Sequence, residues 1–317
     1  MNRIARSALY YSGLLGLART PRRQALRILV YHRFDNLTDE PSRLVWQCEH
    51  IRRHYAPISL AEVTEASAHG RKLPPNALTV TVDDGHRDFI QHALPIFSAY
   101  KIPVTLFVVS DAADAKKWLW FDQVSYLVAE TQRETLDLEG KTIDLKSDRR
   151  RVANEIVERL KRTPHRERLR TLMELPNKLA VDLPAQAPAA YSLLDWAELR
   201  TLTKHQVEIG CHSKTHPILS QLEDRSALYE EISDAKLRME EQLGTPVIHF
   251  AYPNGTWNDF NEEITSIVKS TGFRCALTAE SGLNEAGWNA FALLRLGVEP
   301  SFSKKRFSEL LAGVRKY

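Results

Sequence analysis

Short apolar runs alternate with longer, helix-like stretches along most of the chain. The apolar runs predict seven strands, at residues 27–31, 78–82, 104–109, 207–209, 247–251, 273–278 and 291–296. Helices are predicted between them, at residues 44–54, 88–100, 195–204, 225–243 and 261–270. This alternation is typical of an α/β fold with a parallel sheet, and seven strands are enough for a closed or nearly closed barrel.

One stretch, residues 111–190, breaks this alternation because it is longer than a single crossover between strands requires. It contains the charged run at residues 148–151 and a segment rich in Pro and Ala at residues 183–190. We therefore predict a mostly helical insertion in the barrel, and we expect it to end in a linker-like loop.

Residues 1–25 form a separate N-terminal segment that is partly apolar and basic. Its apolar part, residues 4–17, is shorter than the roughly 20 residues of a membrane-spanning helix, and no small-residue cleavage site follows it cleanly. Two interpretations stay open: an amphipathic helix on an anionic membrane surface, or a helix packed against the domain. We expect a cytoplasmic location, with peripheral membrane contact if the segment lies on a bilayer.

Composition narrows the classes of function. The chain has 317 residues, of which 43% are hydrophobic, so it can bury a substantial core. The net charge is only +3 and no basic run is interleaved with aromatic residues, which argues against a nucleic-acid partner. Three widely spaced cysteines, an odd number, do not form a disulfide framework, and we expect a reducing compartment.

Polar side chains that can carry chemistry fall at the carboxyl ends of the predicted strands. They follow the first, second, fourth and fifth strands: His32, Asp83 with Asp84, His212 with His216, and residues 252–255. In α/β barrels this end of the strands carries the active site, so residues distant in sequence would meet there. Asp83, Asp84 and Gly85 alone would also fit an ordinary turn, but the other groups favour a site.

A metal site is predicted from His212, His216 and Asp84. Two His four positions apart can present their imidazoles to one ion, and a carboxylate completes a set that leaves positions open for water and substrate. Zn²⁺, Co²⁺ and Ni²⁺ all accept such ligands. His50 and His54 have the same spacing, but they lie in a charged helix far from an acidic strand end, and we predict no metal there.

Three segments together resemble a known family. Residues 80–85, 210–217 and 250–255, in that order, resemble the first three motifs of the polysaccharide deacetylases, also called the NodB-homology group or carbohydrate esterase family 4. The resemblance covers residues 26–298 outside the insertion. It implies a distorted (β/α) barrel in a catalytic domain at residues 26–317, one divalent metal ion, and hydrolysis of N-acetyl groups on the amino sugars of a polysaccharide, oligosaccharide or lipid-linked glycan.

The resemblance also implies roles for individual residues. Asp83 matches the catalytic base, and Asp84, His212 and His216 match the metal ligands, with Zn²⁺ the expected ion and Co²⁺ or Ni²⁺ as alternatives. Such an ion polarises the acetamide carbonyl. A backbone N–H in the loop at residues 252–255, that of Asn254, would meet the oxyanion.

The chain departs from the family pattern at two places. Ala251 stands where the third motif has an Arg that orients the base, and residues 294–298 lack the His of the usual last motif. His32 resembles the opening His of a rearranged subgroup that includes biofilm poly-N-acetylglucosamine deacetylases, and on that resemblance it would protonate the leaving amine. Arg295 is our candidate for the missing Arg; a rim salt bridge for Arg295 and an ordinary rim or core histidine for His32 stay open.

Aromatic residues near the motifs are candidates for stacking on sugar rings. They are Trp118, Trp120, Phe121, Tyr252 and Trp257. Aromatic side chains also contribute large buried areas to protein cores, so an ordinary packing role is the alternative for each.

Other functions fit parts of the same pattern. The same residues could cleave an O-acetyl ester or a cyclic amide. Two His and one carboxylate also suit ferrous iron and oxygenation, but that chemistry leaves Asp83 without a role. Ala251 and the altered last motif fit an inactive carbohydrate-binding relic, although a relic has no reason to retain a base and ligands together.

Overall fold

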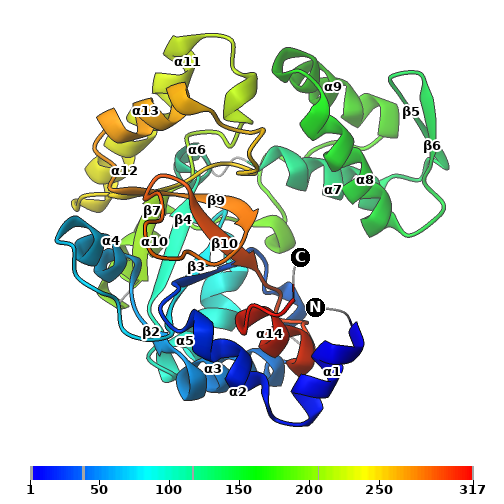
Figure 1. The fold of residues 1–317 in the computed structure, drawn as a ribbon. Helices are drawn as coiled ribbons and strands as arrows, with labels where there is room; N and C mark the ends of the chain where they lie inside the picture. Colours follow the sequence, from blue (N-terminus) through cyan, green and yellow to red (C-terminus); the bar gives the residue numbers. More distant parts are fainter. Residues whose placement is uncertain (1–2, 38–39, 116–117, 206, 316–317) are drawn as a thin grey trace.

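A closed barrel of seven parallel strands forms the centre of the fold (Figure 1). The structure is a computed structural model that describes residues 3–37, 40–115, 118–205 and 207–315. The strands follow one another around the barrel in the order β1, β10, β9, β8, β7, β4 and β3, and β3 pairs with β1 to close it. Their bounds are β1 Arg27–Tyr31, β3 Ala77–Val82, β4 Val104–Val108, β7 Val207–Cys211, β8 His249–Ala251, β9 Cys275–Ser281 and β10 Leu293–Gly297. The predicted barrel is confirmed.

The strands are recognisable in the sequence because most are buried on both faces. Every residue of β1, β3 and β4 is buried, so these strands read as continuous runs of apolar and β-branched residues. An eighth strand, β2 (Ala56–Pro57), pairs with the start of β3 and was not predicted. Two residues are too few to show a periodic pattern.

Helices surround the barrel, and two of the predicted ones contain a π-helical turn. The turns are at Phe89–Ala93, before α5, and at Glu230–Asp234, between α11 and α12. The α-helices outside the insertion and the N-terminal segment are α3 Ser42–His54, α4 Leu60–Ala68, α5 Leu94–Ala99, α10 Trp196–Leu202, α11 Arg225–Tyr229, α12 Ala235–Leu243, α13 Glu262–Ser270 and α14 Lys304–Leu311. Short 3₁₀ helices lie at Thr20–Arg22, Asp35–Leu37, Ala189–Tyr191, Thr203–His205 and Leu219–Gln221.

The insertion is mostly helical, as predicted, and has a hydrophobic core of its own. Its elements are α6 Ser110–Ala115, α7 Trp120–Glu130, β5 Thr135–Leu138, β6 Lys141–Asp144, α8 Arg149–Arg162 and α9 His165–Leu179. The antiparallel hairpin of β5 and β6 was missed. Gly140 was the sequence signal for its turn. Glu139 and Gly140 both adopt positive φ, as tight hairpin turns require, and glycine adopts this backbone easily.

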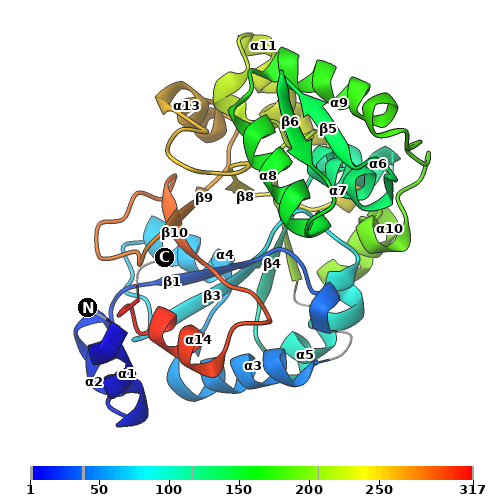
Figure 2. The same cartoon turned by 90° about the vertical axis from the view of Figure 1, so that its right-hand side faces the viewer.

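The N-terminal segment contains α1 (Arg3–Tyr11) and α2 (Leu15–Arg19). Helix α1 lies beside α14, where Lys305 Nζ donates to Ser7 Oγ at 2.6 Å (Figures 1 and 2). Tyr11 and Leu17 nevertheless remain 77% and 66% exposed. The structure therefore has the helix packed against the domain, and membrane contact stays a prediction. Among the helices of the described residues, none is both long and apolar enough to cross a membrane.

Candidate metal centre

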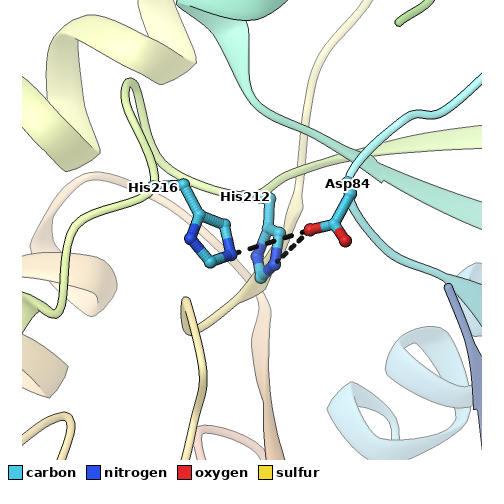
Figure 3. A group of neighbouring side chains, drawn as sticks. All are labelled: Asp84, His212 and His216. Atoms are coloured by element: carbon cyan, nitrogen blue, oxygen red, sulfur yellow. Dashed lines mark ion pairs between the residues drawn. The ribbon is translucent and has the colours of Figure 1, made fainter. Parts of the chain in front are cut away.

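The loops that follow β3 and β7 bring one carboxylate and two imidazoles together (Figure 3). The Nε2 atoms of His212 and His216 each lie 3.6 Å from Oδ1 of Asp84. The ligand atoms of these three buried residues all lie within 4.8 Å of one another. No other group of three His, Cys, Asp or Glu side chains in the described part of the chain is arranged this way. The predicted ligands therefore converge on one point.

His212 presents Nε2 in the form that binds a metal, and His216 is neutral. His212 Nδ1 lies 2.8 Å from the carbonyl oxygen of Ala251, so it donates there and leaves the Nε2 lone pair free. Burial lowers the pKa of His216 to about 3, with a further contribution from His212, and this keeps the imidazole neutral. Two neutral imidazoles and one carboxylate are a donor set that fits a divalent ion.

The backbone around the ligands adopts uncommon conformations. Four non-glycine residues at the site have positive φ: Asp84 at 75°, Ser213 at 63°, His216 at 61° and Asn254 at 55°. Such conformations cost of order 1–3 kcal/mol each and persist only where the surroundings hold them. Their concentration in the three predicted motifs supports a functional role for these loops.

Glu231, in the π-helical turn between α11 and α12, holds the loop that carries the two His. Its carboxylate accepts hydrogen bonds from the backbone N–H groups of Lys214 at 3.0 Å and Thr215 at 2.9 Å, and from Thr215 Oγ1 at 2.6 Å. Ser213 Oγ accepts from the backbone N–H of His216 at 3.0 Å. The sequence analysis missed Glu231, because nothing in a charged helical pattern distinguishes one Glu from its neighbours.

Asp83 has its shortest contact with Arg295, and its other carboxylate oxygen, Oδ2, lies 3.9 Å from His212 Nε2. Arg295 Nη1 lies 2.8 Å from Asp83 Oδ1, and both side chains are 2% exposed. Burial opposes the ionisation of Asp83, but the Arg295 guanidinium outweighs it, and the pKa of Asp83 falls to about 2. Asp83 is therefore a carboxylate at neutral pH. Arg295 reaches it from β10, whereas Ala251, at the family's usual Arg position, has no side chain that could.

His32 and Asn254 lie at the same site. His32 Nε2 is 4.0 Å from Asp83 Oδ2, and its side chain is 55% exposed. Both residues line a cavity of about 240 Å³ that also contains the metal-ligand group and Asp83. Within the described residues, the side-chain nitrogen of Asn254 is buried without a hydrogen-bond partner. Asn254 therefore has a donor beside the cavity without an acceptor in the described part of the chain.

The predicted aromatic residues are only partly at the site. Tyr252 lines the cavity, but its ring stacks on Phe260 with centroids 4.0 Å apart. Trp257 is 55% exposed and is not among the lining residues. Trp120 is 9% exposed and donates its indole N–H to the carbonyl oxygen of His216 at 3.3 Å, so it supports the His loop rather than offering a stacking face. Phe121 does line the cavity.

A buried pair of His86 and Asp122 beside the site was also missed. His86 Nε2 lies 2.8 Å from Asp122 Oδ2, which joins the loop after β3 to helix α7 of the insertion. His86 directly follows Gly85 of the first motif, which was a usable signal. No sequence pattern pointed to Asp122, because its partner His86 is far away in the sequence.

Comparison with known proteins gives a consistent result. The family model described as polysaccharide deacetylase matches residues 70–276, more than half of the chain. The poly-beta-1,6-N-acetyl-D-glucosamine N-deacetylase of Escherichia coli K12 is 39% identical over 49 residues, which are 16% of this chain and 7% of that protein. The match therefore spans only a small part of that relative.

Two solved structures have a similar fold. The Streptococcus pyogenes deacetylase PplD in complex with acetate is 16% identical, with a TM-score of 0.59 over 90% of this chain and 98% of that one. IcaB of Ammonifex degensii is 18% identical, with a TM-score of 0.59 over 92% of this chain and 97% of that one.

The first prediction concerns metal binding. We expect Asp84→Ala and His212→Ala each to weaken Zn²⁺ or Co²⁺ binding by more than the roughly 10–100-fold that loss of an outer-shell partner costs. Calorimetric titration of the metal-free protein measures this. His54→Ala is the control, because it removes one member of the other His pair at the same spacing, on α3. Equal affinity in all of these proteins would contradict the site.

The second prediction concerns the Asp83–Arg295 pair. Arg295→Met should reduce the free energy of unfolding by about 3–5 kcal/mol, because it leaves a buried carboxylate without its partner. Adding Asp83→Asn should recover part of that loss, because the unpaired charge is then removed. Urea unfolding measures both changes. Arg274→Met, which breaks an exposed pair with Glu65, should have a much smaller effect.

Proposed function

The chain belongs to the polysaccharide deacetylase family, and on that premise we propose that it is a metal-dependent hydrolase that removes N-acetyl groups from the amino sugars of a glycan. The observation that carries the proposal is the placement of the Asp84, His212 and His216 group beside an ionised carboxylate, Asp83, which Arg295 holds in place. A base next to an electrophilic centre is what hydrolysis of an unreactive amide requires.

The proposed substrate is a chain of N-acetylglucosamine units. The E. coli relative is named for a β-1,6-linked polymer of this sugar, and the two proteins share 39% identity over the matched 49 residues. We propose Zn²⁺ as the ion, with Co²⁺ or Ni²⁺ as alternatives, because all three accept two imidazoles and a carboxylate. Asp84 Oδ1 and the Nε2 atoms of His212 and His216 would hold it. When bound, the ion supplies the Lewis acidity that polarises the acetamide carbonyl.

The residues of the chain divide the proton transfers between them. Asp83, ionised because of Arg295, accepts the proton of the attacking water. His32, half exposed and 4.0 Å from Asp83 Oδ2, donates a proton to the departing amine, a role that imidazole side chains often perform in catalysis. Asn254 lines the cavity, and its backbone N–H would donate to the carbonyl oxygen as negative charge develops there.

The third prediction tests the activity itself. The metal-loaded protein should release acetate from β-1,6-linked N-acetylglucosamine oligomers, lose that activity with a chelator and regain it with Zn²⁺. Asp83→Asn should retain the metal but lose about 10²–10⁴-fold in kcat, the usual contribution of a general base. Asp114→Asn, at a surface ion pair with Arg238, is the control and should be fully active. Full activity of Asp83→Asn would refute the assignment.

Three further measurements separate the other candidate activities. Acetate release from O-acetylated sugars without release from N-acetylated ones would identify an esterase. Oxygen consumption with a ferrous ion would identify an oxygenase. Binding of the oligomers without any product would identify a carbohydrate-binding relic.

The fourth prediction concerns the general acid. His32→Ala should reduce kcat by about 10²-fold or more with little change in metal content, because the side chain transfers a proton without touching the ligand group. His69→Ala, which removes a surface His paired with Glu65, is the control. An unchanged kcat in His32→Ala would assign proton donation to another group.

A further inference from the structure

Helix α8 of the insertion turns one face toward the catalytic residues. Arg150, Asn154, Val157 and Lys161 are spaced three and four positions apart, so they lie on the same side of the helix. Asn154, Val157 and Lys161 line the inner cavity of about 240 Å³ that contains Asp83 and the ligand group. Arg150 and Asn154 line an adjoining outer cavity of about 530 Å³. We call these four residues the α8 wall.

The inner and outer cavities form one cleft between the barrel and the insertion. The residues that line both cavities are His32, Asp84, Phe121, Ser125 and Asn154. The inner cavity alone is smaller than the roughly 300–1,000 Å³ of ligand pockets, whereas the joined cleft falls within that range. The cleft therefore extends past the point of chemistry along α8.

The lining of the outer cavity fits an uncharged, hydroxyl-rich ligand. With His32 and His86 counted as neutral, its formal charges balance: three arginines, Arg33, Arg149 and Arg150, stand against three aspartates, Asp35, Asp84 and Asp122. Asn154 offers an amide that can donate and accept, and Ser125 Oγ, which donates to the carbonyl oxygen of Phe121 at 2.9 Å, can accept from a ligand. Phe121 and Tyr191 add aromatic rings, on which the apolar face of a sugar can pack.

Three contacts fix the position of α8 relative to the metal-ligand group. Asp122 at the start of α7 pairs with His86 at 2.8 Å, next to the first motif. Gln221 joins the barrel to the insertion, since it accepts from Arg168 Nη1 at 2.6 Å and donates to the carbonyl oxygen of Lys161 at 2.8 Å. A binding surface held in this way is preorganised rather than assembled by the ligand.

We propose that the α8 wall binds at least one further sugar of a neutral N-acetylated oligosaccharide, next to the sugar that is deacetylated. The proposal deepens the proposed function and rests on it for the identity of the inner sugar. Arg150 and Asn154 provide the polar contacts to the outer sugar.

The kinetic test compares N-acetylglucosamine with its β-1,6-linked oligomers. We expect kcat/KM to rise about tenfold or more from monomer to oligomer. Arg150→Ala should lower kcat/KM for oligomers about 5–10-fold through KM, as expected for a lost polar contact, and leave the monomer unaffected. Asn154→Ala should lower kcat/KM for both, because Asn154 lines the inner and the outer cavity. Arg151→Ala is a matched control: Asp148 Oδ1 accepts from the backbone N–H of both Arg150 and Arg151, but only Arg150 lines the cleft.

A binding test does not depend on turnover. Metal-loaded Asp83→Asn, titrated with the oligomer in a calorimeter, should bind it, and adding Arg150→Ala should raise Kd about 5–10-fold while Arg151→Ala leaves it unchanged. If Arg150→Ala and Arg151→Ala behave alike in both tests, the α8 wall is refuted. Binding that depends on Arg150, without acetate release by the wild-type protein, would refute the deacetylase function and support the wall. Absence of both binding and release would refute both.

Discussion

The buried ion pair of Asp83 and Arg295 is the interaction on which the site depends. Two charges that are each 2% exposed are costly to desolvate, and they are tolerated only where their hydrogen bonds are satisfied. Arg295 meets this condition, because its Nε also donates to the carbonyl oxygen of Thr278 at 2.5 Å. The pair links the residue after β3 to β10, the two strands that flank β1 in the barrel.

The neighbouring carboxylates of Asp83 and Asp84 have different partners because the chain turns between them. Asp83 continues from β3 and meets Arg295 inside the barrel, whereas the positive φ of Asp84 directs its side chain to His212 and His216. Gly85, with φ of 80°, continues the turn without the steric cost that a side chain would bring. One strand end thereby supplies both an ion pair and a ligand within two residues.

Sequence patterns predicted the strands and the residues at their carboxyl ends, because these depend on the local order of residues along the chain. Buried strands read as continuous apolar runs, and parallel strands bring their carboxyl ends together, so the places of Asp84, His212 and His216 followed from periodicity and barrel geometry. Arg295 was proposed because Ala251 stands where the family pattern has a base-orienting Arg. Glu231, Asp122 and the α8 wall could not be found this way, because each acquires its place from a contact between segments distant in sequence.

The insertion has its own hydrophobic core, yet its contacts with the barrel are concentrated around the ligand loops. Asp122 bonds to His86, Trp120 to the carbonyl oxygen of His216, and the Phe121 ring packs against the His216 ring at 5.2 Å. The loops that contain the ligand residues therefore also contact the insertion. Since a packed interface of this kind transmits strain, a change in the shape of the cleft would be felt at the ligand group.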